Sequence, residues 1–296
     1  MRRVLLSIAL ASSLTACLDG HEPKAPFAER WVRFGRVRAL LAGGVDGRGG
    51  GGGPVLVYLH GFASLPEDQR PLRDGLDVPA GTRFVFPEGP LGVTIPEGPR
   101  RAWWLLDRPL RRRLRAEPHG MRELAGTRPA GLTEARRGIE DLLDGIERRL
   151  GAPPERTLLA GFSQGAILAT DVALRTDRPL AGLGILSGTT VAAQDWTPRM
   201  EDRRALPVFV THGRADELLP FPMAERLVAE LRTRGVDVRW HPHPEGHEMS
   251  PVIVPAFSAF VYETLAGPRT GVTADRTEIM PRSPARRRRA GANERP

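Results

Sequence analysis

The chain has 296 residues, a hydrophobic fraction of 41% and a formal net charge of +8, which suits one large α/β domain or two small ones. The positive charge lies at the ends: residues 1–16 contain two arginines and no acidic residue, and residues 267–296 contain eight arginines against three acidic residues. The body between them is left with a net charge of +1, so it offers no electrostatic attraction for phosphates, and we expect no nucleic-acid partner.

Residues 1–16 have the features of an export signal. Two arginines precede an apolar run from Val4 to Leu14, and the segment ends in the small residue Ala16. The run is too short to span a bilayer as a helix. Cys17 follows directly and is the only cysteine of the protein, so it has no partner for an internal disulfide.

The four residues from Leu14 to Cys17 resemble the lipobox of bacterial lipoproteins. In that family the signal is cut before the cysteine, which is then acylated, and acyl chains on Cys17 would hold the protein at a membrane. The resemblance implies an exported, membrane-anchored lipoprotein of a bacterial cell envelope. The alternative is an ordinary signal peptide that leaves a secreted or periplasmic soluble protein. Residues 17–30 are polar and contain prolines, and we interpret them as a tether.

The first part of the body predicts strands. Residues 31–41 alternate large and charged residues and predict a strand, whereas residues 43–53 are mostly glycine and predict a flexible hairpin loop. The apolar run 55–59 predicts a buried parallel strand with apolar side chains on both faces, and residues 82–86 predict a second one.

Residues 91–131 have weaker patterns. The adjacent Trp103 and Trp104 stand in a loop region, where they either line an acyl pocket or form local core. The basic run 111–113 is interpreted as a solvated helix face.

The second part of the body alternates strands with helices. Residues 133–150 place their apolar side chains on one helical stripe, and Gly151 stands where the helix should end. Further strands are predicted at 157–160, 181–186, 206–210 and 236–240, and further helices at 166–174, 222–234 and 257–265. The pattern predicts an α/β fold over residues 31–266, with a mostly parallel central sheet and helices on both faces. In such a sheet the site lies beyond the carboxyl ends of the strands.

Residues 267–296 are rich in arginine and proline and have little periodic apolar content, which predicts a disordered tail. Its run from Arg286 to Arg289 suits either contact with anionic lipid headgroups or plain solvation.

A Gly-x-Ser-x-Gly pentapeptide, residues 161–165, lies between a predicted strand and a predicted helix. This arrangement is typical of a nucleophile elbow, a sharp turn that exposes the serine hydroxyl. The glycines leave room because they have no Cβ, and the N-terminus of the following helix points toward the place where an oxyanion would form. The alternative is a glycine-rich turn with a bystander serine at Ser163.

A serine nucleophile needs a histidine base and a carboxylate that orients the histidine. In this fold the chain order is Ser, then Asp or Glu, then His, which Ser163, Asp216 and His247 satisfy, each after a predicted strand. The backbone N–H groups of Gln164 and Phe62 are candidate oxyanion donors. The alternatives are Glu217 and Asp195 for the acid, and His241 and His243 for the base; His60 and His212 are interpreted as structural hydrogen-bonding residues beside the site.

Several blocks together resemble the phospholipase/carboxylesterase family of α/β-hydrolases, which includes carboxylesterases, lysophospholipases and acyl-protein thioesterases. The blocks, found in order between about residues 54 and 266, are 59–61, 161–165, 186–188, 212–220 and 246–248. The resemblance implies the triad Ser163, Asp216 and His247, the oxyanion donors Phe62 and Gln164, and no cofactor or metal. Ala63 departs from the family, which often has glycine there, and residues 105–131 match nothing and are expected to shape the substrate pocket.

The sequence therefore predicts a serine hydrolase that cleaves small-molecule or lipid carboxylic esters through an acyl-enzyme. A lysophospholipase or an acyl-thioesterase would use the same triad with a different pocket. A catalytically silent, lipid-anchored binding protein is the alternative of another class, and the intact triad argues against it.

Overall fold

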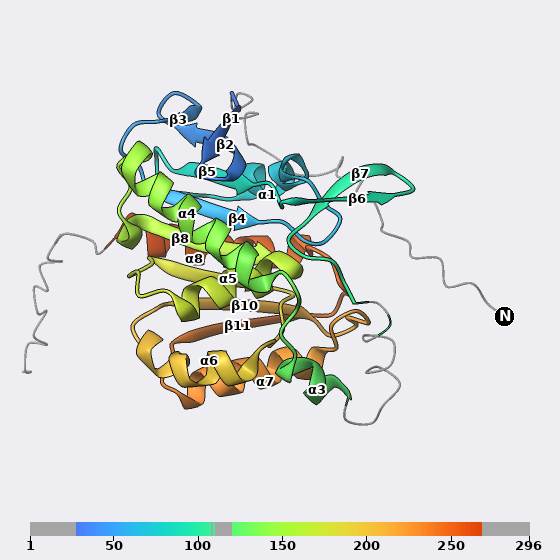
Figure 1. Cartoon of the computed structure of the whole chain (residues 1–296). Helices are drawn as coiled ribbons and strands as arrows, with labels where there is room; N and C mark the ends of the chain where they lie inside the picture. Colours follow the sequence, from blue (N-terminus) through green and yellow to red (C-terminus); the bar gives the residue numbers. More distant parts are fainter. Residues whose placement is uncertain (1–27, 108, 110–119, 268–296) are drawn as a thin grey trace, which may run out of the picture.

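The computed structural model describes residues 28–107, 109 and 120–267, which form an α/β fold around a nine-stranded sheet (Figure 1). The strands lie in the order β1, β2, β5, β4, β8, β9, β10, β11, and β3 pairs with β2. Neighbours from β5 to β11 are parallel, whereas β1 and β2 run antiparallel at one edge. Their bounds are β1 Arg30–Phe34, β2 Val37–Gly44, β3 Arg48–Gly50, β4 Val55–Leu59, β5 Arg83–Pro87, β8 Thr157–Phe162, β9 Gly182–Leu186, β10 Val208–Gly213 and β11 Val238–His243.

Helices cover both faces of the sheet, which confirms the predicted fold class. In Figure 1, α4 and α5 lie in front of the sheet and α8 lies behind it. Helices α4, α5, α6 and α7 contribute to one core cluster, and α1 and α8 contribute to the other. The α-helix bounds are α1 Arg70–Gly75, α3 Gly120–Gly126, α4 Leu132–Leu150, α5 Gln164–Arg175, α6 Ala193–Met200, α7 Phe221–Thr233 and α8 Val254–Ala266. Short 3-10 helices occupy Pro66–Gln69, Pro154–Arg156, Glu201–Arg203 and Pro251–Ile253.

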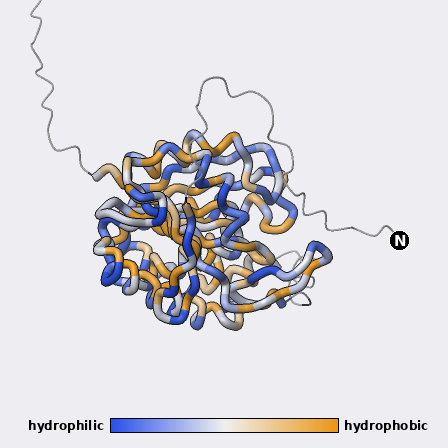
Figure 2. The backbone as a smooth tube through the Cα atoms, turned by 90° about the horizontal axis from the view of Figure 1, so that it is seen from above, coloured by the Kyte–Doolittle hydropathy of each residue, from blue (hydrophilic) through white to orange (hydrophobic). Residues whose placement is uncertain are grey.

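The central strands are apolar on both faces because each face meets a helical layer. In β4 all five side chains are buried; Val55, Val57 and Leu59 belong to one cluster, and Leu56 and Tyr58 to the other. Successive strand residues point to opposite faces, so a continuous apolar run fills both layers. Figure 2 shows hydrophobic stretches of the backbone, in orange, interspersed with hydrophilic ones, in blue.

Three local predictions differ from the structure. The strand predicted over residues 31–41 is a hairpin, because Gly35 takes a left-handed φ of +57° and reverses the chain between β1 and β2. The glycine-rich loop contains the short strand β3. Within residues 91–131, the strands β6, Leu91–Ile95, and β7, Gly98–Ala102, form a separate hairpin that the sequence did not indicate.

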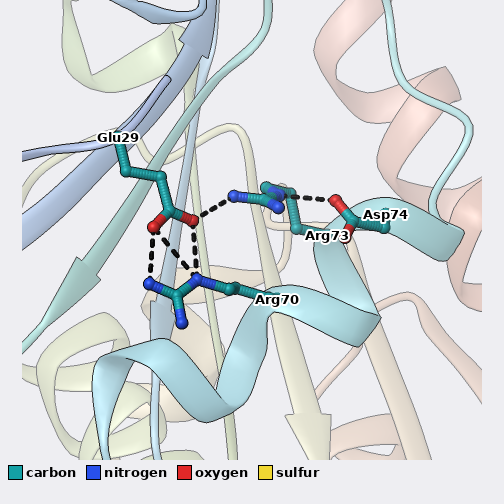
Figure 3. Close-up of polar contacts among 4 residues, drawn as sticks. All are labelled: Glu29, Arg70, Arg73 and Asp74. Atoms are coloured by element: carbon teal, nitrogen blue, oxygen red, sulfur yellow. Dashed lines mark hydrogen bonds and ion pairs between the residues drawn. The ribbon is translucent and has the colours of Figure 1, made fainter. Parts of the chain in front are cut away.

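Glu29 fixes the start of the described chain to α1 (Figure 3). Its carboxylate accepts hydrogen bonds from Nε of Arg70 at 3.0 Å and from Nη2 of Arg70 at 2.7 Å, and it also pairs with Arg73. Arg73 is buried and bonds Asp74 at 2.7 Å as well. The Arg70 hydrogen bonds, reinforced by Arg73 against the opposing effect of burial, hold the pKa of Glu29 below its usual value. The chain is therefore fixed to the body one residue before β1 begins.

Several predicted features lie outside the described residues: the signal at 1–16, Cys17 and most of the tether, the basic run 111–113, and the tail beyond Gly267 with Arg286 to Arg289. Within the part of the chain that the structure describes, no helix is both long enough and apolar enough to cross a bilayer.

Candidate active site

Ser163 stands at a sharp turn between β8 and α5. Its backbone has φ +53° and ψ −117°, a conformation that is costly for a residue with a side chain. The flanking glycines permit the turn. A Cβ on Gly161 would lie 2.5 Å from the carbonyl carbon of Gly165, and a Cβ on Gly165 would overlap the backbone oxygen of Leu59. The elbow therefore packs directly on β4, and both glycines are needed for close approach.

Ser163, His247 and Asp216 form a continuous hydrogen-bonded chain. Nε2 of His247 lies 2.7 Å from Oγ of Ser163, and Nδ1 of His247 lies 2.7 Å from Oδ2 of Asp216. Because Asp216 is an acceptor when ionised, Nδ1 carries the proton and the free lone pair of Nε2 accepts from the serine hydroxyl. The three side chains come from the segments that follow β8, β10 and β11, at the edge of the sheet where the sequence analysis expected them.

The alternative residues lie elsewhere or have other partners. Asp195 is on α6, where it pairs with Arg128 and Arg175. His243 bonds Glu245 at 2.8 Å. His241 stacks on Phe209, with ring centroids 5.0 Å apart. The structure thus brings together the three residues that the chain order selected.

The carboxylate of Asp216 is fully buried and surrounded by donors. Oδ1 accepts from the backbone N–H groups of Leu218 and Leu219, both at 2.8 Å, and Oδ2 faces His247 at 2.7 Å and His212 at 3.0 Å. Burial alone would raise the pKa of Asp216, but the hydrogen bonds from His212 and His247 outweigh it and hold the pKa well below its usual range. Asp216 therefore stays ionised, as an acceptor for His247 must.

Two contacts place His247 over the serine. Its ring lies against Phe162, with centroids 5.1 Å apart and planes inclined at 45°. The loop that carries it is held against the end of β10, where a Cβ on Gly213 would overlap the backbone oxygens of Glu245 and Gly246. The N–H of Ala215 also bonds the Glu245 oxygen at 3.0 Å. The close approach of the two loops thus depends on Gly213, which precedes the turn that carries Asp216.

The loop after β4 runs beside the nucleophile. A Cβ on Gly61 would lie 3.5 Å from the Cβ of Ser163. The backbone N–H groups of Phe62 and Gln164, the two predicted oxyanion donors, have no hydrogen-bond partner among the described residues. Ala63 has φ +57°, a left-handed conformation that glycine adopts more easily, so the alanine found at this position keeps the backbone shape at some cost in strain.

His60 holds that loop from the interior. Its Nε2 accepts from the N–H of Gly89 at 3.0 Å, so Nδ1 carries the proton and donates to the oxygen of Gly61 at 2.7 Å. The C=O of Gly61 and the N–H of Phe62 belong to one trans peptide and point in opposite directions. The hydrogen bond that fixes the C=O of Gly61 therefore also fixes the direction of the Phe62 N–H. Burial lowers the pKa of His60 to about 4, which keeps the ring neutral. The structural role expected for His60 agrees with these contacts.

Trp103 and Trp104 are core residues. They are 2% and 3% exposed, which favours the local-core alternative over the lining of an acyl pocket. The indole of Trp103 donates to the oxygen of His60 at 2.8 Å and stacks on its ring. The side chain of Gln164 accepts from the N–H of Trp103 at 2.9 Å and donates to the oxygen of Trp104 at 2.8 Å. The pair thus ties the elbow to the loop after β4, a role that no local sequence signal indicated.

Among the described residues, no group of three or more His, Cys, Asp or Glu side chains could hold a metal ion. The arrangement consists of a serine hydroxyl bonded to an oriented imidazole, beside two backbone N–H groups that have no partner in the described part of the chain. This arrangement can perform acyl transfer.

Residues 53–265 match the family model described as Phospholipase/Carboxylesterase. Acyl-protein thioesterase 1 of Mycosarcoma maydis is 28% identical over 230 residues, which cover 71% of this chain and 91% of that protein. The crystal structure of esterase PE8 is 27% identical, with a TM-score of 0.59 over 76% of this chain and 99% of that one. A carboxylesterase structure from Mesorhizobium loti shares the fold, with a TM-score of 0.57 at 17% identity over 81% of this chain and 99% of that one. The chain belongs to the phospholipase/carboxylesterase family of α/β-hydrolases.

Proposed function

We propose that this protein is a serine hydrolase that cleaves carboxylic esters through an acyl-enzyme. The observation that carries the proposal is the unbroken hydrogen-bonded chain from Ser163 through His247 to the ionised Asp216. Membership of a family of esterases and thioesterases supports the same chemistry. No cofactor enters the proposed reaction.

In the first half-reaction Oγ of Ser163 attacks the ester carbonyl while Nε2 of His247 takes the hydroxyl proton. The carbonyl oxygen becomes an oxyanion, which the N–H groups of Phe62 and Gln164 stabilise; one such donor is typically worth about 2.7–4 kcal/mol of barrier. The tetrahedral intermediate collapses with loss of the alcohol, which leaves with the proton from His247. Asp216 stabilises the imidazolium throughout.

In the second half-reaction a water molecule attacks the acyl-serine, and His247 takes a proton from this water. Collapse of the second tetrahedral intermediate returns the proton to Oγ of Ser163 and releases the carboxylic acid. Protons and charges balance over the cycle, and the enzyme regains its starting state.

Thioester or lysophospholipid hydrolysis is the second candidate, with the same triad. The observation that favours it is the similarity to an acyl-protein thioesterase over most of both chains. A thioester differs from the matching oxygen ester only in its leaving group, so turnover of a matched pair of substrates measures the preference directly.

The test is hydrolysis of p-nitrophenyl acetate, butyrate and laurate, and of the thioester matching the best of these, by the protein lacking residues 1–17. Ser163→Ala is the matched control. Activity that the variant lacks would support the proposal, and the chain-length profile would separate an esterase from a lipid-directed enzyme. A folded wild-type protein that is no faster than the variant, and takes no fluorophosphonate label, would instead be a binding protein.

We also propose that Cys17 is lipidated and anchors the protein to a membrane of a bacterial cell envelope. The lipobox-like sequence before Cys17 supports this proposal. The full chain should partition into the detergent phase of Triton X-114, and Cys17→Ser should move it to the aqueous phase. Equal partition of the two proteins would favour a secreted or periplasmic soluble protein.

A further inference from the structure

His212 is a second histidine on the carboxylate of Asp216, and the hydrolytic mechanism above does not use it. It lies at the end of β10 and has no exposed surface. Its Nε2 is 2.7 Å from the backbone oxygen of Leu219 and 3.0 Å from Oδ2 of Asp216. Both partners are acceptors, so Nε2 carries a proton and shares it between them.

The other ring nitrogen indicates why a histidine stands here. Nδ1 of His212 is buried and has no hydrogen-bond partner among the described residues. An unpaired buried polar atom is costly, and an apolar residue at this position would avoid that cost. The N–H at Nε2 therefore explains why a histidine is found at this position, because it donates to the charged carboxylate of Asp216.

The imidazoles of His212 and His247 donate to the same oxygen. Oδ2 of Asp216 accepts from Nδ1 of His247 at 2.7 Å and from Nε2 of His212 at 3.0 Å. A donor on Oδ2 withdraws negative charge from the oxygen that stabilises the protonated form of His247. It also fixes the carboxylate against rotation, together with the backbone donors on Oδ1.

We propose that His212 is a positioning residue of the hydrolase, one that holds the Asp216 carboxylate in place for His247 and limits how strongly the carboxylate stabilises the imidazolium. This inference rests on the proposed function. Without the His212 donor, Asp216 would turn more freely, and when aligned with His247 its Oδ2 would attract a protonated imidazole more strongly. We therefore expect His212 to extend the activity of the enzyme toward acidic pH.

Other charged groups lie on the elements packed against this cluster. His243 and Glu245, on the β11 side, bond each other at 2.8 Å. Arg214 follows β10 and lies over the ring of the first residue of α7, and Glu217 adjoins Asp216 in the chain. All four groups remain in every variant below, so their electrostatic effect on the site is the same in all of them.

If His212 had a purely structural role, that role would depend on its hydrogen bond to the Leu219 oxygen, which connects the turn after Asp216 to β10. Two amide substitutions separate the roles. In His212→Gln the side-chain N–H₂ can reach the place of Nε2 and serve both acceptors, whereas in His212→Asn the same amide is one methylene too short. Neither amide titrates near neutral pH, so neither variant introduces a new ionisable group.

The experiment measures kcat, KM and the pH profile of kcat/KM on p-nitrophenyl butyrate for the wild type, both amide variants and Ser163→Ala. Rates of the wild type and the two amide variants are expressed per serine labelled by a fluorophosphonate, so a partly unfolded fraction does not enter. The rate of Ser163→Ala, which has no nucleophile to label, is expressed per mole of protein. We expect His212→Asn to lower kcat about 10- to 100-fold with little change in KM. We expect its acid limb to move up by about half a pH unit or more. His212→Gln should recover most of both effects.

Two results would overturn the inference: equal behaviour of the two amide variants, or a loss of kcat with an acid limb that does not move. Neither result would contradict the proposed function, provided that Ser163→Ala is inactive. Undiminished activity of Ser163→Ala would instead defeat the proposed function itself, so the two failures are distinguishable.

Discussion

Asp216→Asn is the substitution for which the structure gives the sharpest expectation. The carboxylate holds donors on both oxygens: the N–H groups of Leu218 and Leu219 on one, and the imidazoles of His247 and His212 on the other. An asparagine amide has acceptor capacity only on its oxygen. Whichever way the amide is turned, two of the four donors face an NH₂ group in place of an acceptor.

The magnitude depends on which way the amide is turned. When the NH₂ group faces the backbone donors, the buried N–H of Leu219 loses its acceptor, and the free energy of unfolding should fall by about 1–3 kcal/mol. When the NH₂ group faces His247, the imidazole must present an unprotonated Nδ1 to it and carry its proton on Nε2. The base then cannot accept the hydroxyl proton of Ser163, and kcat should fall about 10⁴-fold, as for other triads with this change.

The assay combines turnover of p-nitrophenyl butyrate with urea unfolding at pH 7. Ser163→Ala is the control, because its hydroxyl contributes the single hydrogen bond to His247 that we describe. It should abolish turnover while changing the free energy of unfolding by less than about 1 kcal/mol. An Asp216→Asn enzyme with both a kcat within tenfold of the wild type and wild-type stability would refute this reasoning.

Three further predictions concern the support of the site. Burial lowers the pKa of His60 from 6.5 to about 4; the unfolded chain then binds the proton first, so the free energy of unfolding should fall by up to about 3 kcal/mol between pH 6.5 and pH 4. Urea titrations should show this slope reduced in His60→Gln, and an unchanged slope would contradict it. Gly165→Ala should cost about 1–3 kcal/mol, because its Cβ overlaps the Leu59 oxygen. Gly138→Ala, whose Cβ would meet its nearest neighbour at 3.4 Å, should be neutral or stabilising, and equal melting temperatures for the two would count against the packing argument. Gln164→Ala should lower the near-ultraviolet dichroism of the buried tryptophans and reduce kcat; an unchanged spectrum would show that the Gln164 bonds do not order that segment.

The elbow and its partners could be predicted from sequence because their signals are local or depend on chain order. The glycines at 161 and 165 are required by contacts that the structure confirms, with Leu59 and within the turn itself. Asp216 and His247 follow strands of a parallel sheet, and the carboxyl ends of parallel strands meet at one edge. Topology therefore brings these residues together without any knowledge of side-chain contacts.

The support of the site could not be predicted in the same way. Trp103 follows the hairpin of β6 and β7, and nothing local indicates that its indole bonds the oxygen of His60. His212 precedes a glycine at a strand end, which indicated a structural residue. That it shares Oδ2 of Asp216 with His247 depends on where three separate loops meet. The hairpin of β1 and β2 depends on one glycine, Gly35, inside an otherwise strand-like run.

The central claim is that Ser163 forms the acyl-enzyme. The most direct measurement is rapid mixing of the enzyme with p-nitrophenyl butyrate, followed by acid quenching and mass spectrometry of the peptides. The account predicts a burst of one p-nitrophenol per active site and one butyryl group on the peptide that contains Ser163, with neither in Ser163→Ala. Turnover by the wild type without a burst or an adduct, or an adduct at another residue that persists in the variant, would contradict it.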